Sequence, residues 1–143
     1  ENDPEHKLYL LYSAGNWVEV SEGTPYCIIG ESGYGKPLLD RVLRYESSMD
    51  LALKVGFLAF DATRTSSTSV EYPLDVVAYR TDTFDIVESR FEKEDLLNSS
   101  AWWQARIAES VDQLPAQWTD RVLAPLSNHT TRSPRPDRTP GPT

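Results

Sequence analysis

The segment MDLALKVGFLAFD, residues 49–61, is the sequence feature that most constrains the fold of this chain. Lys54 is the only charged residue between the two aspartates near its ends, so a helix formed here has no polar face. A helix of this kind is covered on both sides, by a sheet and by another element or subunit. Ser47 or Ser48 can cap its first turn through a side-chain oxygen. The segment therefore predicts a helix inside a layered structure.

The other expected elements are two hairpins, one short strand and two helices. KLYLLY (7–12) and NWVEV (16–20) are expected to pair around a turn, and YCII (26–29) to form a short buried strand. PLLDRVLR (37–44) has helical spacing. LDVVAYR (74–80) and FDIVESRF (84–91) predict a second hairpin, whose first strand is apolar on both faces and therefore belongs to a central, doubly covered sheet.

A third helix is expected to start near residues 98–100 and to end at Pro115. Its apolar stripe is formed by Trp103, Ile107, Val111 and Leu114. The polar run TRTSSTS, residues 63–69, is expected to be a loop. The resulting order, β-β-β-α-α-β-β-α, is α+β and differs from the strand–helix alternation of a doubly wound nucleotide-binding fold.

The stretch GESGYGKP, residues 30–37, imitates a phosphate-binding loop. Gly30, Gly35 and Lys36 occupy the fixed positions of the pattern G-x-x-x-x-G-K-[ST]. Pro37, however, stands where a Ser or Thr hydroxyl meets magnesium, and no repeated βα units follow. The residues alone favour a glycine-rich strand-to-helix turn with proline in the first turn of the helix, over the alternative of a nucleotide site.

Common catalytic sets are missing from the body of the sequence. The histidines are His6 and His129, one near each end, so Ser–His–Asp, Cys–His and histidine-based zinc chemistry are not expected. Cys27 is the single cysteine and is expected to be a small buried hydrophobe. The acids Asp40, Asp61 and Asp75 form no obvious pair, and we expect no cofactor and no metal.

The polar run after the long helix is the densest hydroxyl cluster. It places one acid beside several hydroxyls: Asp61, Thr63, Ser66, Ser67 and Ser69. A set of this kind can hold an ammonium group or organise a proton relay. The chain offers no nucleophile or base to work with it, so the residues alone leave its role open.

Charge and composition limit the partners. The formal net charge of −8 makes nucleic acid and anionic membrane poor partners. No apolar run reaches the ~18 residues of a membrane span, and there is no signal peptide, so we expect a cytoplasmic protein. From residue 127 the chain holds four prolines and three arginines, which predicts a folded part over 1–126 and a disordered Pro/Arg-rich tail over 127–143.

Three segments together resemble one protein family. IIGESGYGKPLLDRVL (28–43), FDATRTSSTSVEYPLDVVAYR (60–80) and YLLYSAGNWVEVSEGTPYCIIGES (9–32) resemble bacterial proteasome-type peptidases of the Anbu group, the ancestral β subunit. The resemblance covers about residues 7 to 118. It implies an αββα four-layer N-terminal-nucleophile hydrolase fold, of which this chain holds the second half, and it implies that strands and helices before residue 1 are missing.

The resemblance also implies site residues. In such hydrolases an N-terminal Thr or Ser attacks a peptide carbonyl, and its own α-amine is the base. Glu1 has no hydroxyl, so the nucleophile is not in this sequence. By the match, Ser32 hydrogen-bonds near the nucleophile's amine, while Asp61, with Ser66 as its partner, orients that amine. Lys36 is then a helix-start residue.

Two functions follow as hypotheses. The chain is a fragment of a self-compartmentalising threonine-type peptidase, acting on peptide or unfolded-protein substrates and supporting an N-terminal nucleophile. The alternative is a non-catalytic proteasome-like subunit or oligomerisation module. In both, the helix pair over residues 37–61 is expected to contact identical subunits in a ring or open-ring assembly.

Overall fold

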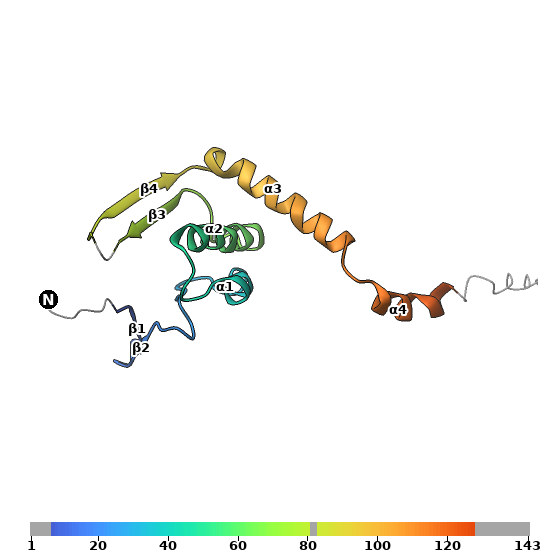
Figure 1. Ribbon diagram of the computed structural model, residues 1–143, viewed down its shortest axis with the longest axis horizontal. Helices are drawn as coiled ribbons and strands as arrows, with labels where there is room; N and C mark the ends of the chain where they lie inside the picture. The colour runs from blue at the N-terminus through green and yellow to red at the C-terminus, as the bar shows by residue number, and fades with distance from the viewer. Residues whose placement is uncertain (1–6, 81–82, 128–143) are drawn as a thin grey trace, which may run out of the picture. The chain divides into compact units, whose positions relative to one another are not determined.

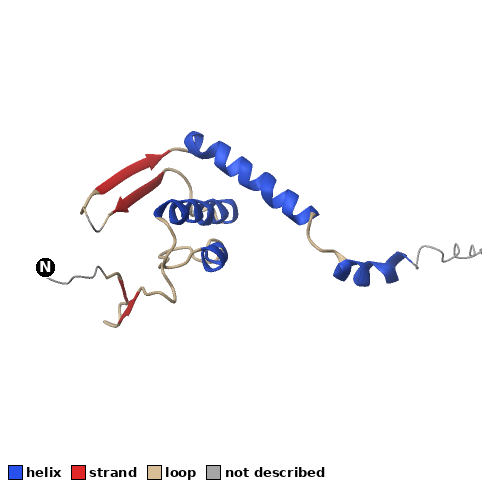
Figure 2. Cartoon of the chain, in the orientation of Figure 1, coloured by secondary structure: helices blue, strands red, loops and turns tan. Residues whose placement is uncertain are grey.

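The computed structural model describes residues 7–80 and 83–127. The chain divides into two units, residues 1–103 and 104–143. Figures 1 and 2 show the elements, which follow one another as β1 (Tyr9–Leu11), β2 (Trp17–Glu19), α1 (Lys36–Val42), α2 (Met49–Ser66), β3 (Leu74–Tyr79), β4 (Ile86–Phe91), α3 (Lys93–Asp112) and α4 (Gln117–Ser127). The second unit holds the end of α3 and all of α4.

Both expected hairpins are confirmed. β1 and β2 pair antiparallel with Leu10 opposite Val18, and the chain turns between them at Gly15, whose φ of 83° suits glycine. β3 and β4 pair antiparallel from Leu74↔Phe91 to Tyr79↔Ile86. Across this second pair the Arg90 guanidinium donates two hydrogen bonds to the Asp75 carboxylate, at 2.7 and 2.8 Å. The pKa of Asp75 is lowered because its charged form accepts these bonds.

The core of the first unit lies between α1 and α2. Leu39 of α1 packs with Val55 and Ala59 of α2, and Tyr26, Ile28 and Leu43 are partly buried against them. The start of each helix is as expected: Pro37 lies in the first turn of α1, and the Ser48 hydroxyl accepts a hydrogen bond from Leu51 N–H at 3.2 Å.

Two glycines of the GESGYGKP segment are required for different structural reasons. Gly30 has a φ of 81°, in the left-handed region that glycine tolerates best. Gly35 is a point of close approach, since a Cβ on it would lie 2.8 Å from the Ala59 carbonyl oxygen and 3.0 Å from the Ala59 Cβ. The expected strand-to-helix turn therefore fixes how closely α1 packs on α2.

Several boundaries differ from expectation. α2 continues to Ser66 instead of ending near residue 61, so the run 63–69 is mostly helix. α3 begins at Lys93, several residues earlier than expected, and α4 was not expected at all. The order over the described residues is therefore β-β-α-α-β-β-α-α.

The expected strand YCII is not a strand in the structure. Tyr26 and Ile28 are half-buried against the helix pair, whereas Cys27 and Ile29 are exposed, so the segment alternates as a strand does but has no partner strand among the described residues. The expectation that Cys27 is buried is wrong for this structure. A strand needs a neighbour to satisfy its backbone groups, and sequence pattern alone does not supply one.

The doubly covered sheet is also not present within the described residues. Leu74, Val76 and Ala78 are half-buried on one face of the β3–β4 hairpin. The other face is open: Val77 is 65% exposed and Ile86 62% exposed. The structure is therefore α+β without the full four layers implied by the resemblance.

Two expectations fall outside the described residues. These are the position of His6 and the predicted tail over residues 127–143, of which only residue 127 is described, as the end of α4. Among residues 7–80 and 83–127, no helix combines the length and hydropathy needed to cross a membrane.

We predict that Gly35→Ala destabilises the first unit by about 1–3 kcal/mol, because the added methyl meets the α2 backbone at Ala59 and pushes the helices apart. Gly33→Ala is the matched control, since a Cβ there comes no closer than 3.4 Å to any atom, a Glu31 side-chain oxygen. Equilibrium unfolding in urea measures the difference. Equal midpoints for the two variants would show that the close approach does not limit packing.

Candidate functional site

A buried carboxylate lies on α2. Asp61 is only 7% exposed, although it is charged. Its two oxygens accept hydrogen bonds from the Ser100 hydroxyl of α3 at 2.9 and 3.0 Å, and Oδ1 also accepts from the Arg64 guanidinium at 2.9 Å. Burial of an isolated charge is costly, so these two partners make the position tenable.

The Arg64 side chain is held from several directions. Its guanidinium lies 5.3 Å from the centre of the Tyr72 ring, and that ring meets Phe60 edge to face at 5.2 Å. The hydrogen bond to Asp61 raises the pKa of Arg64, and burial raises the pKa of Tyr72. Arg64 Nε is buried and has no hydrogen-bond partner among the described residues. The carboxylate is thus paired with a cation that is itself fixed.

The hydroxyls of residues 63–69 do not bind the Asp61 carboxylate within the described residues, in contrast to what the sequence suggests. Thr63 and Thr65 donate to the carbonyls four residues earlier, Ala59 O at 2.7 Å and Asp61 O at 2.8 Å. In these bonds the two hydroxyl protons are donated within the helix. Ser66 is the exposed last residue of α2 and is not among the partners of the Asp61 carboxylate in the described part of the chain.

Ser32 lies in the loop before α1 and is exposed. It lines an open hollow of about 390 Å³ together with Lys36 and residues of the first hairpin. Lys36 is the first residue of α1, as expected. The loop reaches the neighbourhood of Asp61 through Gly35, which packs against Ala59 two residues before the acid.

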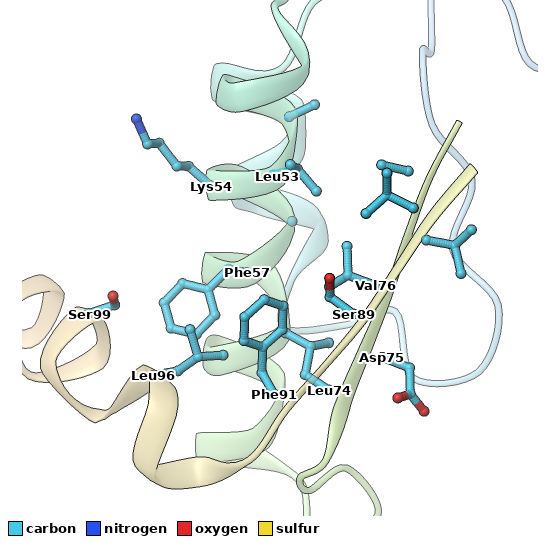
Figure 3. A pocket seen from close by; sticks show the side chains of 15 residues that line it. Leu53, Lys54, Phe57, Leu74, Asp75, Val76, Ser89, Phe91, Leu96 and Ser99 are labelled. Atoms are coloured by element: carbon cyan, nitrogen blue, oxygen red, sulfur yellow. The ribbon is translucent and has the colours of Figure 1, made fainter. Parts of the chain in front are cut away.

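A larger hollow, of about 620 Å³, opens between α2, the β3–β4 hairpin and the start of α3. Figure 3 shows Phe57, Phe91 and Leu96 converging on it, while the Asp75 carboxylate points away. Its lining is mainly apolar, with the half-buried inner face of the hairpin on one side. Asp61 does not line this hollow, and no charged side chains converge on it. The lining therefore suits packing against another apolar surface and offers no catalytic groups.

Sequence reasoning missed two partners of the candidate acid. Ser100 was noted only as a possible start of the third helix, and Arg64 only as part of a polar loop. The helical spacing of Asp61 and Arg64 was visible once α2 is extended, because residues three apart share a face. The contact with Ser100 joins residues 39 positions apart, which no local pattern reveals. Within the described ranges, no group of three or more His, Cys, Asp or Glu is placed to hold a metal.

Solved structures resemble the chain, whereas no protein-family model and no curated protein matches it. Anbu from Hyphomicrobium sp. strain MC1 is 38% identical with a TM-score of 0.73, over 76% of this chain and 48% of that one. Anbu (ancestral beta-subunit) from Yersinia bercovieri is 36% identical with a TM-score of 0.72, over 76% and 47%. The matched part of this chain belongs to the Anbu family.

A third Anbu structure, described as a helical assembly of the Anbu complex from Pseudomonas aeruginosa, is 34% identical with a TM-score of 0.69. The match covers 76% of this chain and 46% of that one. The chain therefore spans about half the length of the solved Anbu structures that it matches. The expected resemblance is confirmed, and the α+β fold corresponds to part of a proteasome-like N-terminal-nucleophile hydrolase.

We predict that Ser100→Ala destabilises the first unit by about 1–3 kcal/mol, because it leaves a buried carboxylate with one donor fewer. Ser99→Ala is the control, since the neighbouring Ser99 is exposed and lies on the same helix. Hydrogen exchange of the α3 amides measures the effect. Equal protection in the two variants would mean that the bond to Asp61 does not hold α3.

Proposed function

We propose that this chain is the second half of a cytoplasmic Anbu-type peptidase subunit and supports an N-terminal nucleophile supplied by the remaining half. The observation that carries the proposal is Asp61, a buried carboxylate held by two donors, in a chain that matches about half of Anbu. A buried charge is costly to keep and needs fixed partners, which supports a role for this carboxylate beyond packing.

The chemistry assigned to the chain is supporting. A Thr or Ser at the mature N-terminus attacks the peptide carbonyl, with its α-amine as the base. Asp61 accepts a hydrogen bond from that amine and steadies its charged form. The carboxylate has room for this bond, because Oδ2 accepts only from Ser100 among the described residues. Ser32 hydrogen-bonds near the same amine.

The open apolar surfaces support the same proposal. Val77 and Ile86 are exposed on the outer face of the β3–β4 hairpin, and the large hollow beside α2 is apolar. Exposed sheet edges and apolar faces promote aggregation unless they are covered. The remaining half of an Anbu subunit supplies strands and helices for this purpose, which restores the four layers.

A non-catalytic subunit or oligomerisation module is the second candidate. It is supported by one observation, the exposed apolar residues such as Val42 and Val77, which need a covering partner but no chemistry. Both candidates assemble from identical subunits, as the helical assembly of Pseudomonas aeruginosa Anbu suggests by homology. The helix pair α1 and α2 is assigned to those contacts.

The catalytic proposal is tested in the complete subunit, with fluorogenic peptides as substrates. Asp61→Asn lowers kcat on the order of 100-fold, because the amine loses a charged partner. Ser32→Ala lowers kcat by about tenfold, because one hydrogen bond near the amine is lost. Ser99→Ala serves as the control with wild-type rates. Circular dichroism checks the fold. A wild-type subunit without activity would favour the non-catalytic candidate. Unchanged kinetics in both site variants of an active subunit would contradict the supporting roles of Asp61 and Ser32.

The assembly is tested separately by multi-angle light scattering of the complete subunit. We expect a mass of many subunits, and partial dissociation when Val42→Asp places a charge on the exposed apolar surface of α1. Val77→Asp is the matched comparison, because it places a charge on the hairpin face assigned to the other half of the same subunit and not on the surface assigned to subunit contacts. A monomeric wild type would contradict the assembly.

A further inference from the structure

Three side chains form a hydrogen-bonded cluster beside the GESGYGKP segment. The Lys36 ammonium donates to both oxygens of the Asp40 carboxylate, at 2.9 and 2.7 Å, and lies 3.2 Å from the Tyr26 hydroxyl. The Tyr26 hydroxyl in turn donates to Asp40 Oδ1. Each group contacts the other two, so the cluster is a closed triangle, which we call the Tyr26 clasp.

The clasp joins the two ends of the loop that carries Ser32. Tyr26 precedes the loop, whereas Lys36 and Asp40 follow it on α1. Tyr26 and Asp40 are 14 positions apart, so their hydrogen bond holds together the two ends of the segment that lies between them. Tyr26, Ser32 and Lys36 also line the same hollow. The clasp and the serine are therefore parts of one local structure.

A helix alone gives no reason for a lysine at this position. The amino end of a helix carries partial positive charge, which disfavours a cation in the first turn. Helix α1 has only seven residues and depends on outside contacts for its stability. The side chains of Lys36 and Asp40 are 52% and 49% exposed, so their ion pair alone contributes little.

What distinguishes this pair is the tyrosine. The bond from Lys36 lowers the pKa of Asp40, and the bond to Asp40 raises the pKa of Lys36, so both stay charged at neutral pH. The Tyr26 ring packs against the core formed by Leu39, Val55 and Ala59. The hydroxyl therefore reaches the charged pair from a fixed ring, which ties the pair to the core.

We propose that Tyr26, Lys36 and Asp40 are positioning residues that hold the 27–35 loop so that Ser32 is presented at a fixed place. The inference rests on the proposed function for the role of Ser32, but the fastening of the loop can be measured by itself. None of the three residues touches the reacting atoms; they act through the loop.

The test uses the complete subunit and two readouts. Tyr26→Phe removes the hydroxyl and keeps the ring in the core, and Lys36→Met removes the charge and keeps most of the stem. We expect amide hydrogen exchange in the 30–35 loop to become about three- to tenfold faster in both variants. We also expect kcat for peptide hydrolysis to fall about three- to tenfold at an unchanged KM. Lys36→Arg keeps a cation that donates hydrogen bonds, so we expect loop exchange and kcat close to the wild-type values.

Lys54→Met is the matched control. Lys54 forms a similar exposed pair with Asp50, at 2.7 Å and four residues apart on α2, but it fastens no loop. This variant leaves the exchange of the 30–35 amides and kcat at wild-type values. Unchanged loop exchange in Tyr26→Phe and Lys36→Met would overturn the clasp.

The two proposals fail in different ways. A wild-type subunit without peptidase activity would overturn the proposed function, and the exchange data would still decide whether the clasp holds the loop. Faster loop exchange with wild-type kcat, in a subunit that Ser32→Ala slows, would overturn the positioning role.

Discussion

The packing of α1 on α2 at Gly35 and Ala59 is the contact on which the rest of the first unit depends. Because Gly35 has no side chain, the loop before α1 comes within van der Waals distance of the α2 backbone. This approach buries Leu39 against Val55 and brings the loop of Ser32 to the same helix as Asp61. A phosphate-binding loop uses its glycines to approach an anion, whereas this loop uses one to approach a helix.

Local patterns in the sequence predict the elements that depend on neighbours along the chain. The hairpins, the serine cap and the proline at the start of α1 all follow from residues within a few positions. The patterns fail where a distant partner decides. YCII alternates as a strand does but finds no partner strand in the described residues. The expected loop at 63–69 begins inside α2, which continues to Ser66, and the Thr63 and Thr65 hydroxyls donate to carbonyls one turn earlier.

The candidate site shows the same division. Asp61 could be selected from the sequence by its resemblance to Anbu, and the structure places it among the few buried polar residues described. Its partner Ser100 lies 39 positions away, so only the three-dimensional structure, which brings the two residues together, could reveal it. The apolar faces of residues 74–79 predict a doubly covered sheet, whereas the face that carries Val77 is open within the described residues. Exposed Val77 is thus informative about what is proposed to pack there.

The central claim is that this half of an Anbu subunit supports an N-terminal nucleophile through Asp61. The most direct test is an experimental structure of the complete, mature subunit. The account predicts that Asp61 Oδ2 lies within hydrogen-bond distance, about 2.7–3.2 Å, of the α-amine of the N-terminal residue. An Asp61 carboxylate that meets only Ser100 and Arg64, with the mature N-terminus elsewhere, would contradict it.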